Sequence, residues 1–119
     1  MGPAKRQYYL AHTGSELKKT LWKVFSQYIR RRFADWSGYV ACCSCGTVKH
    51  YKEGDAGHWL SGRYNANLFE PRGCHFQCKP CNGRLRNRKV ENVDGAYDEF
   101  MRQKYGEEVM EELRKQNKM

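Results

Sequence analysis

The amino-acid sequence predicts a small α+β domain whose irregular central part lies between an N-terminal and a C-terminal helical part. Apolar residues recur at three- and four-residue steps near both ends of the chain but not in its middle. Two Cys-x2-Cys pairs, Cys42/Cys45 and Cys78/Cys81, bracket the middle part. Four thiolates in two such pairs suit one tetrahedral zinc ion, because each pair forms a tight turn that delivers two sulfurs. We therefore predict a core that is stapled by zinc and flanked by helices.

The length and charge of the chain fit one small domain with an acidic partner. With 119 residues and a net charge of +9, the chain can bury only a modest apolar core. We divide the single domain 1–119 into a basic amphipathic helix at 1–38, a core at 39–89 and C-terminal helices at 90–119. No apolar run approaches the length of a membrane span, so we expect a soluble, cytoplasmic protein. A pI near 9.4 favours nucleic acid as the partner, with a solvated basic surface as the alternative.

The first predicted element is a long amphipathic helix. Its apolar stripe consists of Leu17, Leu21, Val24, Phe25, Tyr28, Ile29, Phe33 and Trp36. Thr13 and Glu16 form a capping box that would start the helix, and Gly38 would end it. The other face is mostly basic and carries Lys18, Lys19, Lys23, Arg30, Arg31 and Arg32. That face could lie along phosphates or could simply be solvated.

The middle part, from Tyr39 to about Lys89, has no regular period. We predict a short hairpin that carries the first cysteine turn, a strand that ends near His58, an irregular loop, and a second cysteine turn that opens a helix after Pro80. Two cysteines are left over. We interpret Cys43 as a free thiol, whereas Cys74 could be a ligand in a rival arrangement, although Cys78/Cys81 repeats the spacing of the first pair.

The last part returns to helical spacing from Asp94. The apolar positions of the first helix are Tyr97, Phe100, Met101 and Tyr105. Tyr105-Gly106 predicts its end, and a second helix from Glu107 to Gln116 follows with Val109, Met110 and Leu113 on its apolar side. We expect these apolar side chains either to lie in the core or to contact a partner.

A carboxylate, an imidazole and a carboxamide stand between and just after the zinc ligands, at Asp55, His58 and Asn82. These groups suit a divalent ion such as Mg²⁺ or Mn²⁺ and the hydrolysis of a phosphodiester. A neutral His58 can take a proton from the attacking water, while Asn82, helped by Asp55, holds the ion. Zinc that is saturated by four thiolates cannot do this work.

At these residues the sequence resembles the HNH, or His-Me finger, nucleases. The order of the motifs is similar to that of phage endonuclease VII, and their wording is closer to the lambdoid NinG (Rap) recombination protein family. The motifs are Cys42-Cys43-Ser44-Cys45-Gly46, Asp55-Ala56-Gly57-His58-Trp59-Leu60-Ser61, His75-Phe76-Gln77-Cys78-Lys79-Pro80-Cys81-Asn82 and Tyr105-Gly106-Glu107-Glu108-Val109. The resemblance covers Ala41 to about Leu113. It implies a ββα-metal core and a phage or prophage endonuclease that is selective for branched DNA, such as Holliday junctions or D-loops, with His58 as base and Asn82 as metal ligand.

The chain departs from these patterns at two places. In endonuclease VII-like chains the acidic ligand directly precedes the histidine, whereas Gly57 does so here. The NinG-like pattern leads us to expect an asparagine shortly before the His-x-Gln-Cys stretch, where Arg72-Gly73-Cys74 stands. Asn65 and Asn67 are the candidates for buttressing His58 in its place.

Further residues are candidates for the site and for DNA contact. His75 could be a second metal ligand, a phosphate contact or a strand residue that packs against the zinc site. A basic segment follows the last ligand and consists of Arg84, Arg86, Arg88 and Lys89. We interpret this segment, together with Arg30 to Arg32, as a cationic surface that clasps DNA strands without reading bases, and a solubilising surface is the alternative.

Two other functions fit the same residues. One is a non-catalytic zinc-containing module that binds nucleic acid, and the other is a general HNH nicking endonuclease for linear duplex. Resolution of a four-way junction requires two active sites related by a two-fold axis. For that function we expect a homodimer formed through the apolar stripe of the first helix or the apolar face of the C-terminal helices.

Overall fold

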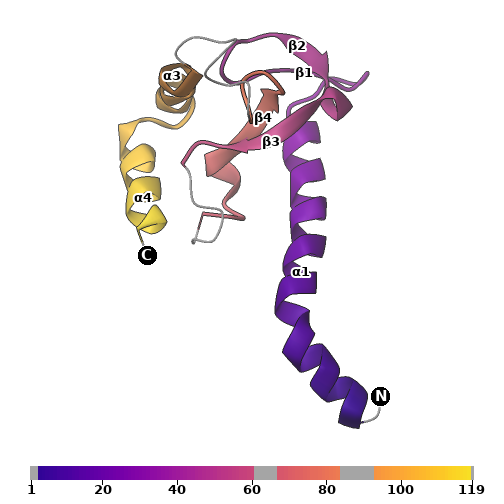
Figure 1. Cartoon of the computed structure of the whole chain (residues 1–119). Helices are drawn as coiled ribbons and strands as arrows, with labels where there is room; N and C mark the ends of the chain where they lie inside the picture. The colour runs from indigo at the N-terminus through magenta and orange to yellow at the C-terminus, as the bar shows by residue number, and fades with distance from the viewer. Residues whose placement is uncertain (1–2, 61–66, 84–92, 119) are drawn as a thin grey trace.

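The computed structural model describes residues 3–60, 67–83 and 93–118 and confirms the α+β class (Figure 1). An N-terminal helix, two antiparallel two-stranded sheets and two C-terminal helices make up this part of the chain. Their bounds are α1 Pro3–Arg32, β1 Tyr39–Ala41, β2 Val48–His50, η1 Tyr51–Glu53, β3 Gly54–His58, η2 Pro71–Gly73, β4 Cys74–Cys78, α3 Val93–Tyr105 and α4 Glu107–Asn117. None of the helices in these ranges combines the length and the apolarity that a bilayer span requires.

Helix α1 begins and ends earlier than the sequence predicts. It starts at Pro3, a residue that suits the first helical position, and it runs through Thr13 and Glu16, so the predicted capping box does not start it. It stops at Arg32, and the chain reverses in a turn whose Gly38 has a φ of +91°. Trp36 therefore lies in the turn and not on the helix. The N-terminal half of α1 extends away from the rest of the molecule (Figure 1).

The predicted apolar stripe of α1 divides into two faces. Trp22, Phe25 and Ile29 pack against the β3–β4 sheet, where they meet Ala56 and Cys74. The second face is exposed, with relative exposures of 46–63%, and consists of Leu17, Leu21, Val24 and Tyr28. These four residues follow one another at steps of four, three and four, which places them on a seam of their own.

The β3–β4 sheet is a ribbon whose two faces meet different partners. Strand β3 pairs antiparallel with β4, so that Gly54 lies opposite Cys78 and His58 lies opposite Cys74. Side chains alternate along each strand. Ala56 and His58 therefore share the face that meets α1, and the other face meets α3 and the first cysteine turn. A Cβ atom at Gly57 would lie 1.8 Å from Gln77 Oε1, so this face requires glycine at position 57.

The C-terminal helices enclose the main apolar core. They are separated by Gly106, whose φ of +88° confirms the predicted break after Tyr105. The buried members of the core are Trp59, Tyr97, Met101, Met110 and Leu113. Trp59 lies directly after His58 and donates a hydrogen bond of 2.7 Å from Nε1 to Asp98 Oδ1. The core therefore anchors the chain at the point where β3 ends.

Candidate functional site

The four predicted zinc ligands lie together. The Sγ atoms of Cys42, Cys45, Cys78 and Cys81 are all within 4.8 Å of one another, and the pair Cys45–Cys78 is 3.6 Å apart. Four sulfurs around a tetrahedral zinc ion, at bonds of about 2.3 Å, are roughly 3.8 Å apart. The cluster therefore fits a structural zinc site, and its four sulfurs would fill the coordination of the ion.

Local backbone geometry brings each cysteine pair into position. In the first turn, Gly46 has a φ of +77° and donates its backbone N–H to Cys42, while the N–H groups of Ser44 and Cys45 point at Cys42 Sγ at 3.4 and 3.5 Å. In the second turn, Cys81 N–H donates to the carbonyl of Cys78 at 3.1 Å. These bonds close each cysteine pair into a tight turn that delivers two sulfurs to one place.

The other two cysteines, Cys43 and Cys74, do not belong to the four-cysteine cluster. Cys74 is fully buried between β4 and α1, and burial raises the pKa of its thiol to about 12. Cys43 packs against the main core, and burial raises the pKa of its thiol well above the usual range. Both are neutral thiols at physiological pH, which agrees with the predicted ligand set.

Asp55 and Asn82 meet beside the second cysteine turn. Asn82 Nδ2 lies 3.2 Å from Asp55 Oδ2, and the ammonium of Lys79 lies 3.0 Å from Asp55 Oδ1. Two oxygen ligands at adjacent positions around Mg²⁺ are about 3 Å apart, since each bond is about 2.1 Å. A half-turn of the Asn82 amide would place its oxygen at such a position. The exposed Lys79 already shows that this carboxylate attracts a cation, and an ion pair of this kind is weak enough to be displaced.

His58 is held from two sides at the end of β3. Its ring stacks on Trp22 of α1, with the ring centroids 5.2 Å apart, and its Nε2 atom lies 3.0 Å from the carbonyl oxygen of Leu68. A carbonyl oxygen only accepts hydrogen bonds, so Nε2 carries a proton and Nδ1 is the basic nitrogen of the neutral ring. A backbone carbonyl leaves no signal in the sequence, and Trp22 lies outside the apolar stripe that the sequence predicts. Sequence reasoning therefore missed both supports.

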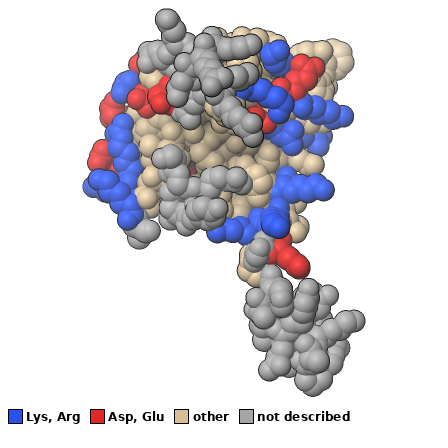
Figure 2. Space-filling view, in the orientation of Figure 1, with Lys and Arg blue, Asp and Glu red and all other residues tan. Residues whose placement is uncertain are grey.

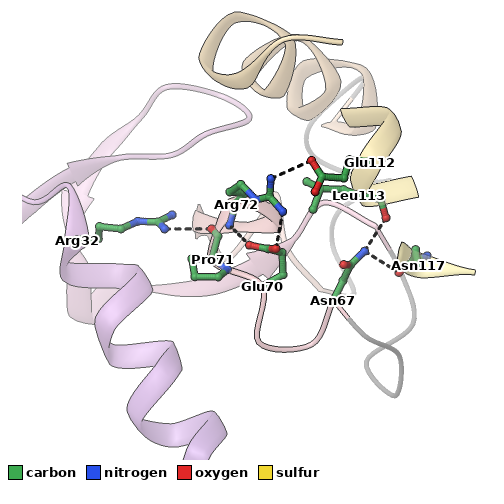
Figure 3. Close-up of polar contacts among 8 residues, drawn as sticks. All are labelled: Arg32, Asn67, Glu70, Pro71, Arg72, Glu112, Leu113 and Asn117. Carbon is green, nitrogen blue, oxygen red and sulfur yellow. Dashed lines mark hydrogen bonds and ion pairs between the residues drawn. The ribbon is translucent and has the colours of Figure 1, made fainter. Parts of the chain in front are cut away.

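The loop that supplies this carbonyl is fastened to two helices (Figure 3). Asn67 is buried and donates from Nδ2 to the carbonyl of Leu113 on α4 at 2.9 Å. On the other side, Arg32 at the end of α1 donates to the carbonyl of Pro71 at 3.0 Å. His58, Asn67 and Leu113 line a common crevice. Asn67 thus anchors the segment next to His58, whereas Asn65 lies outside the described residues.

The structure brings Asp55 and Asn82 together but does not bring His58 to them. His58 stands three residues after Asp55 on β3, which corresponds to about 10 Å of extended chain. An odd number of steps also places their side chains on opposite faces of the ribbon. The sequence also predicts that a helix begins after Pro80. Residues 81–83 form a turn, and residues 84–92 lie outside the described residues.

His75 is a buried residue with two tyrosine partners. Its Nε2 lies 2.9 Å from the hydroxyl of Tyr105, and its Nδ1 lies 3.4 Å from the hydroxyl of Tyr97. Tyr97 donates its own proton to the carbonyl of Gly57 at 2.7 Å, so its oxygen accepts from Nδ1–H and Tyr105 donates to Nε2. Both ring nitrogens are used in this network. The arrangement favours the packing alternative for His75 over a ligand or a phosphate contact.

We expect His75 to make the protein less stable in acid. Burial, with a contribution from the charges of Arg32 and Lys104, lowers the pKa of His75 from 6.5 to about 3. Below pH 6.5 the unfolded chain gains a proton that the folded protein does not take up. The stabilisation is therefore complete above pH 6.5 and is lost as the pH falls toward 3, by up to about 1.4 kcal/mol per pH unit.

Urea unfolding at pH 7.5 and pH 5.0, with zinc in excess, measures this loss. His75→Gln keeps a polar side chain that does not titrate, so its free energy of unfolding should fall less between the two pH values than that of the unchanged protein. Equal losses in the two proteins would assign the acid sensitivity to other groups, such as the zinc ligands.

The predicted DNA-binding arginines of α1 differ in their surroundings. Arg32 donates to the carbonyls of Pro71 and Cys74, and Arg30 donates to the carbonyls of Ser26 and Tyr51. Arg31 is exposed, with its guanidinium over the ring of Tyr51. Arg84, Arg86, Arg88 and Lys89 lie outside the described residues. Figure 2 shows Lys and Arg on both flanks of one face, interleaved with Asp and Glu, and not as one continuous stripe.

Comparison with known proteins places the chain in a phage family. No curated protein and no solved structure matches it. Residues 4–119 match the family model described as the bacteriophage lambda NinG protein, and they include all of helix α1 except Pro3, all four clustered cysteines and the residues around them. Since this match spans nearly the whole chain, the protein belongs to the bacteriophage lambda NinG protein family.

Proposed function

We propose that this protein is a metal-dependent DNA endonuclease of the HNH, or His-Me finger, type that hydrolyses phosphodiester bonds. The observation that carries the proposal is the contact between Asp55 and Asn82, a pair of oxygen donors held beside a cluster of thiols that fits zinc. A carboxylate and a carboxamide are hard ligands, which Mg²⁺ and Mn²⁺ prefer over sulfur. The thiol cluster is the scaffold, and the Asp55/Asn82 pair is the proposed site of the second ion.

In this proposal the residues of the chain divide the work of hydrolysis. Asp55 and Asn82 would hold a divalent ion, which when bound would supply charge stabilisation for the phosphate and the leaving oxygen. His58 takes the proton of the attacking water at Nδ1, since Leu68 keeps the proton of the neutral ring on Nε2. Trp22 holds the plane of the ring. In a complex in which His58 and the Asp55/Asn82 pair act on one phosphate, their separation along β3 must be bridged.

One observation favours a second candidate, a zinc-containing module that binds nucleic acid without cutting it. Asp55 and His58 lie on opposite faces of the β3–β4 ribbon, and the face of His58 is covered by α1. A histidine in this position can serve packing alone. The net charge of +9 would then provide nucleic-acid binding without catalysis.

A cleavage assay separates the two candidates. Purified protein with a fixed zinc content is incubated with branched, nicked and linear DNA in Mg²⁺, in Mn²⁺ and without added divalent ion. The nuclease proposal expects cutting that depends on the added ion. Binding to DNA without cutting under either ion would replace the nuclease by the binding module.

We further propose that the enzyme is selective for branched DNA and acts as a homodimer joined through the exposed seam of α1. Its residues follow the four- and three-residue steps with which two helices pair, and about half of each of these side chains is exposed to solvent. A dimer supplies the two active sites that a four-way junction requires.

Sedimentation of the protein with and without a four-way junction tests the dimer. Leu21→Glu is expected to shift the mass from dimer to monomer and to reduce cleavage of the junction relative to linear duplex. Val48→Glu introduces the same charge at another exposed apolar position, on β2, and should leave the mass unchanged. An unmodified protein that is monomeric and cuts both substrates equally would remove junction resolution and leave the nuclease chemistry standing.

A further inference from the structure

The turn between α1 and β1 presents a tryptophan to solvent. Trp36 is 98% exposed, although tryptophan is on average a well-buried residue. The turn that carries it is ordered by Asp35, whose Oδ1 accepts from Ser37 N–H at 2.9 Å, from Ser37 Oγ at 2.8 Å and from Tyr39 N–H at 3.0 Å. A second link joins the Asp35 N–H to the carbonyl of Tyr39 at 2.9 Å. The indole is thus held out from a fixed turn.

Beside this turn lies a run of aromatic rings. Tyr39 on β1 is opposite His50 on β2, with ring centroids 5.5 Å apart, and His50 is 4.5 Å from the ring of Tyr51. The guanidinium of Arg31 lies 5.2 Å from the centroid of the Tyr51 ring and completes the run. We call these residues, together with Trp36, the aromatic platform.

Gly38 makes the platform sterically feasible. A Cβ atom at this position would lie 2.5 Å from His50 Nε2, and its φ of +91° also disfavours a side chain. The carbonyl of Gly38 accepts from the N–H of Tyr51 at 2.8 Å. Glycine thus allows the ring of His50 to lie against the turn, while the same residue ties the turn to η1.

The chemistry of the platform suits unpaired nucleobases. Every base has a flat face that stacks on an aromatic ring, and a neighbouring guanidinium adds to this attraction and can meet a phosphate. Arg31, whose guanidinium lies over Tyr51, and the exposed Lys52 supply positive charge beside the rings, and Asp35 and Glu53 are exposed acids of the same segments. Val48 is an exposed apolar neighbour on the same face of the hairpin, but it has no ring.

We propose that the aromatic platform stacks with unpaired bases, so that the protein holds single-stranded or splayed nucleotides next to a duplex. The inference rests on the proposed action on DNA and names the feature of the substrate that this surface selects. Bases inside a duplex are already stacked on their neighbours and cannot reach the rings. The platform therefore distinguishes a flap or an open branch from a blunt duplex.

Tryptophan fluorescence and equilibrium binding test the proposal on the zinc-loaded full chain without Mg²⁺ or Mn²⁺. Trp59 is buried and Trp22 is packed on His58, so the part of the quenching that disappears in Trp36→Ala is the signal of Trp36. A single strand and a flapped duplex should quench the signal, and a blunt duplex of matched length should not. Trp36→Ala and Tyr39→Ala should each weaken binding of the first two probes roughly 5- to 150-fold, the range of 1–3 kcal/mol for one stacked base. Blunt-duplex binding should change less than about twofold.

Matched variants keep the outcomes distinct. Trp36→Phe retains a ring and should keep most of the single-strand affinity, and Val48→Ala removes an exposed apolar group from the same hairpin without effect. Equal losses for single strand and blunt duplex, or unchanged single-strand binding in Trp36→Ala and Tyr39→Ala, would overturn the platform while leaving the nuclease proposal intact. A shift in solution mass caused by both Trp36→Ala and Val48→Ala would instead mark the surface as a contact between copies. Absence of any DNA binding by the unmodified protein would overturn both proposals.

Discussion

Serine in place of Cys78 is expected to release zinc and to unfold the central part of the chain. Cys78 ends β4 and lies 3.6 Å from Cys45, so the cluster joins the β1–β2 hairpin to the β3–β4 ribbon. Within the described residues the two sheets are also joined by η1 and by hydrogen bonds such as those from Cys43 N–H to the carbonyl of Phe76 and from Gln77 Nε2 to Ser44 Oγ. Binding of zinc to small domains contributes on the order of 10 kcal/mol, more than the whole stability of many domains of this size.

Zinc content and circular dichroism during heating measure this effect, with Cys43→Ser as the matched control. Cys43 lies in the same turn but packs against the main core, so its variant should keep one zinc ion per chain. X-ray absorption of the bound zinc should report four sulfur ligands. Substantial nitrogen or oxygen ligation would contradict the four-cysteine assignment.

Alanine at His58 or at Asn82 is expected to lower the rate of DNA cleavage by roughly a hundred- to ten-thousand-fold while leaving DNA binding in place. This is the usual range for the loss of a general base, and loss of a metal ligand acts on the same step. Single-turnover cleavage at saturating protein measures the rate, and binding without divalent ion measures affinity. Zinc content should be unchanged, since neither residue belongs to the thiol cluster.

Lys79→Ala complements this test, because we expect this substitution to favour cleavage, whereas the two alanine variants reduce it. Lys79 pairs with Asp55 at 3.0 Å, so its removal frees the carboxylate and should lower the Mg²⁺ concentration that gives half-maximal cleavage. If Asn82→Ala abolished cleavage and His58→Ala did not, the metal site would stand and another base would have to be found. This outcome is informative because the structure separates the two residues along β3.

The elements that local patterns specify could be predicted from the sequence. The spacing of the two cysteine pairs selected the four sulfurs that lie together and left out Cys43 and Cys74. Helical periodicity and Gly106 gave the two C-terminal helices with nearly their observed bounds. In each case the structure is determined by residues that are close in sequence, or by ligand chemistry that allows only one arrangement.

Features that depend on which surfaces meet could not be predicted in the same way. The apolar stripe of α1 gives one period in the sequence, but the sheet covers Ile29 and leaves Val24 exposed, and only the docking angle decides this. Strand β4 alternates apolar and polar residues from Cys74 to Cys78, yet every position is buried, because both faces of the ribbon are covered. The positions of Asp55 and His58 on opposite faces follow from the strand register, and their closeness in sequence pointed the other way.

The bond between Asn67 and α4 bears on the order in which the site forms during synthesis. It links residues that are 46 positions apart, and its acceptor, Leu113, belongs to α4, which follows the loop and α3 along the chain. The four thiols are all made before α3 and α4, so a nascent chain can bind zinc while the loop that holds His58 has its bond to Arg32 of α1 but not yet its bond to α4. The loop beside the proposed base is therefore fastened on both sides only after α4 has folded against it, so the thiol scaffold can form before the proposed site is complete.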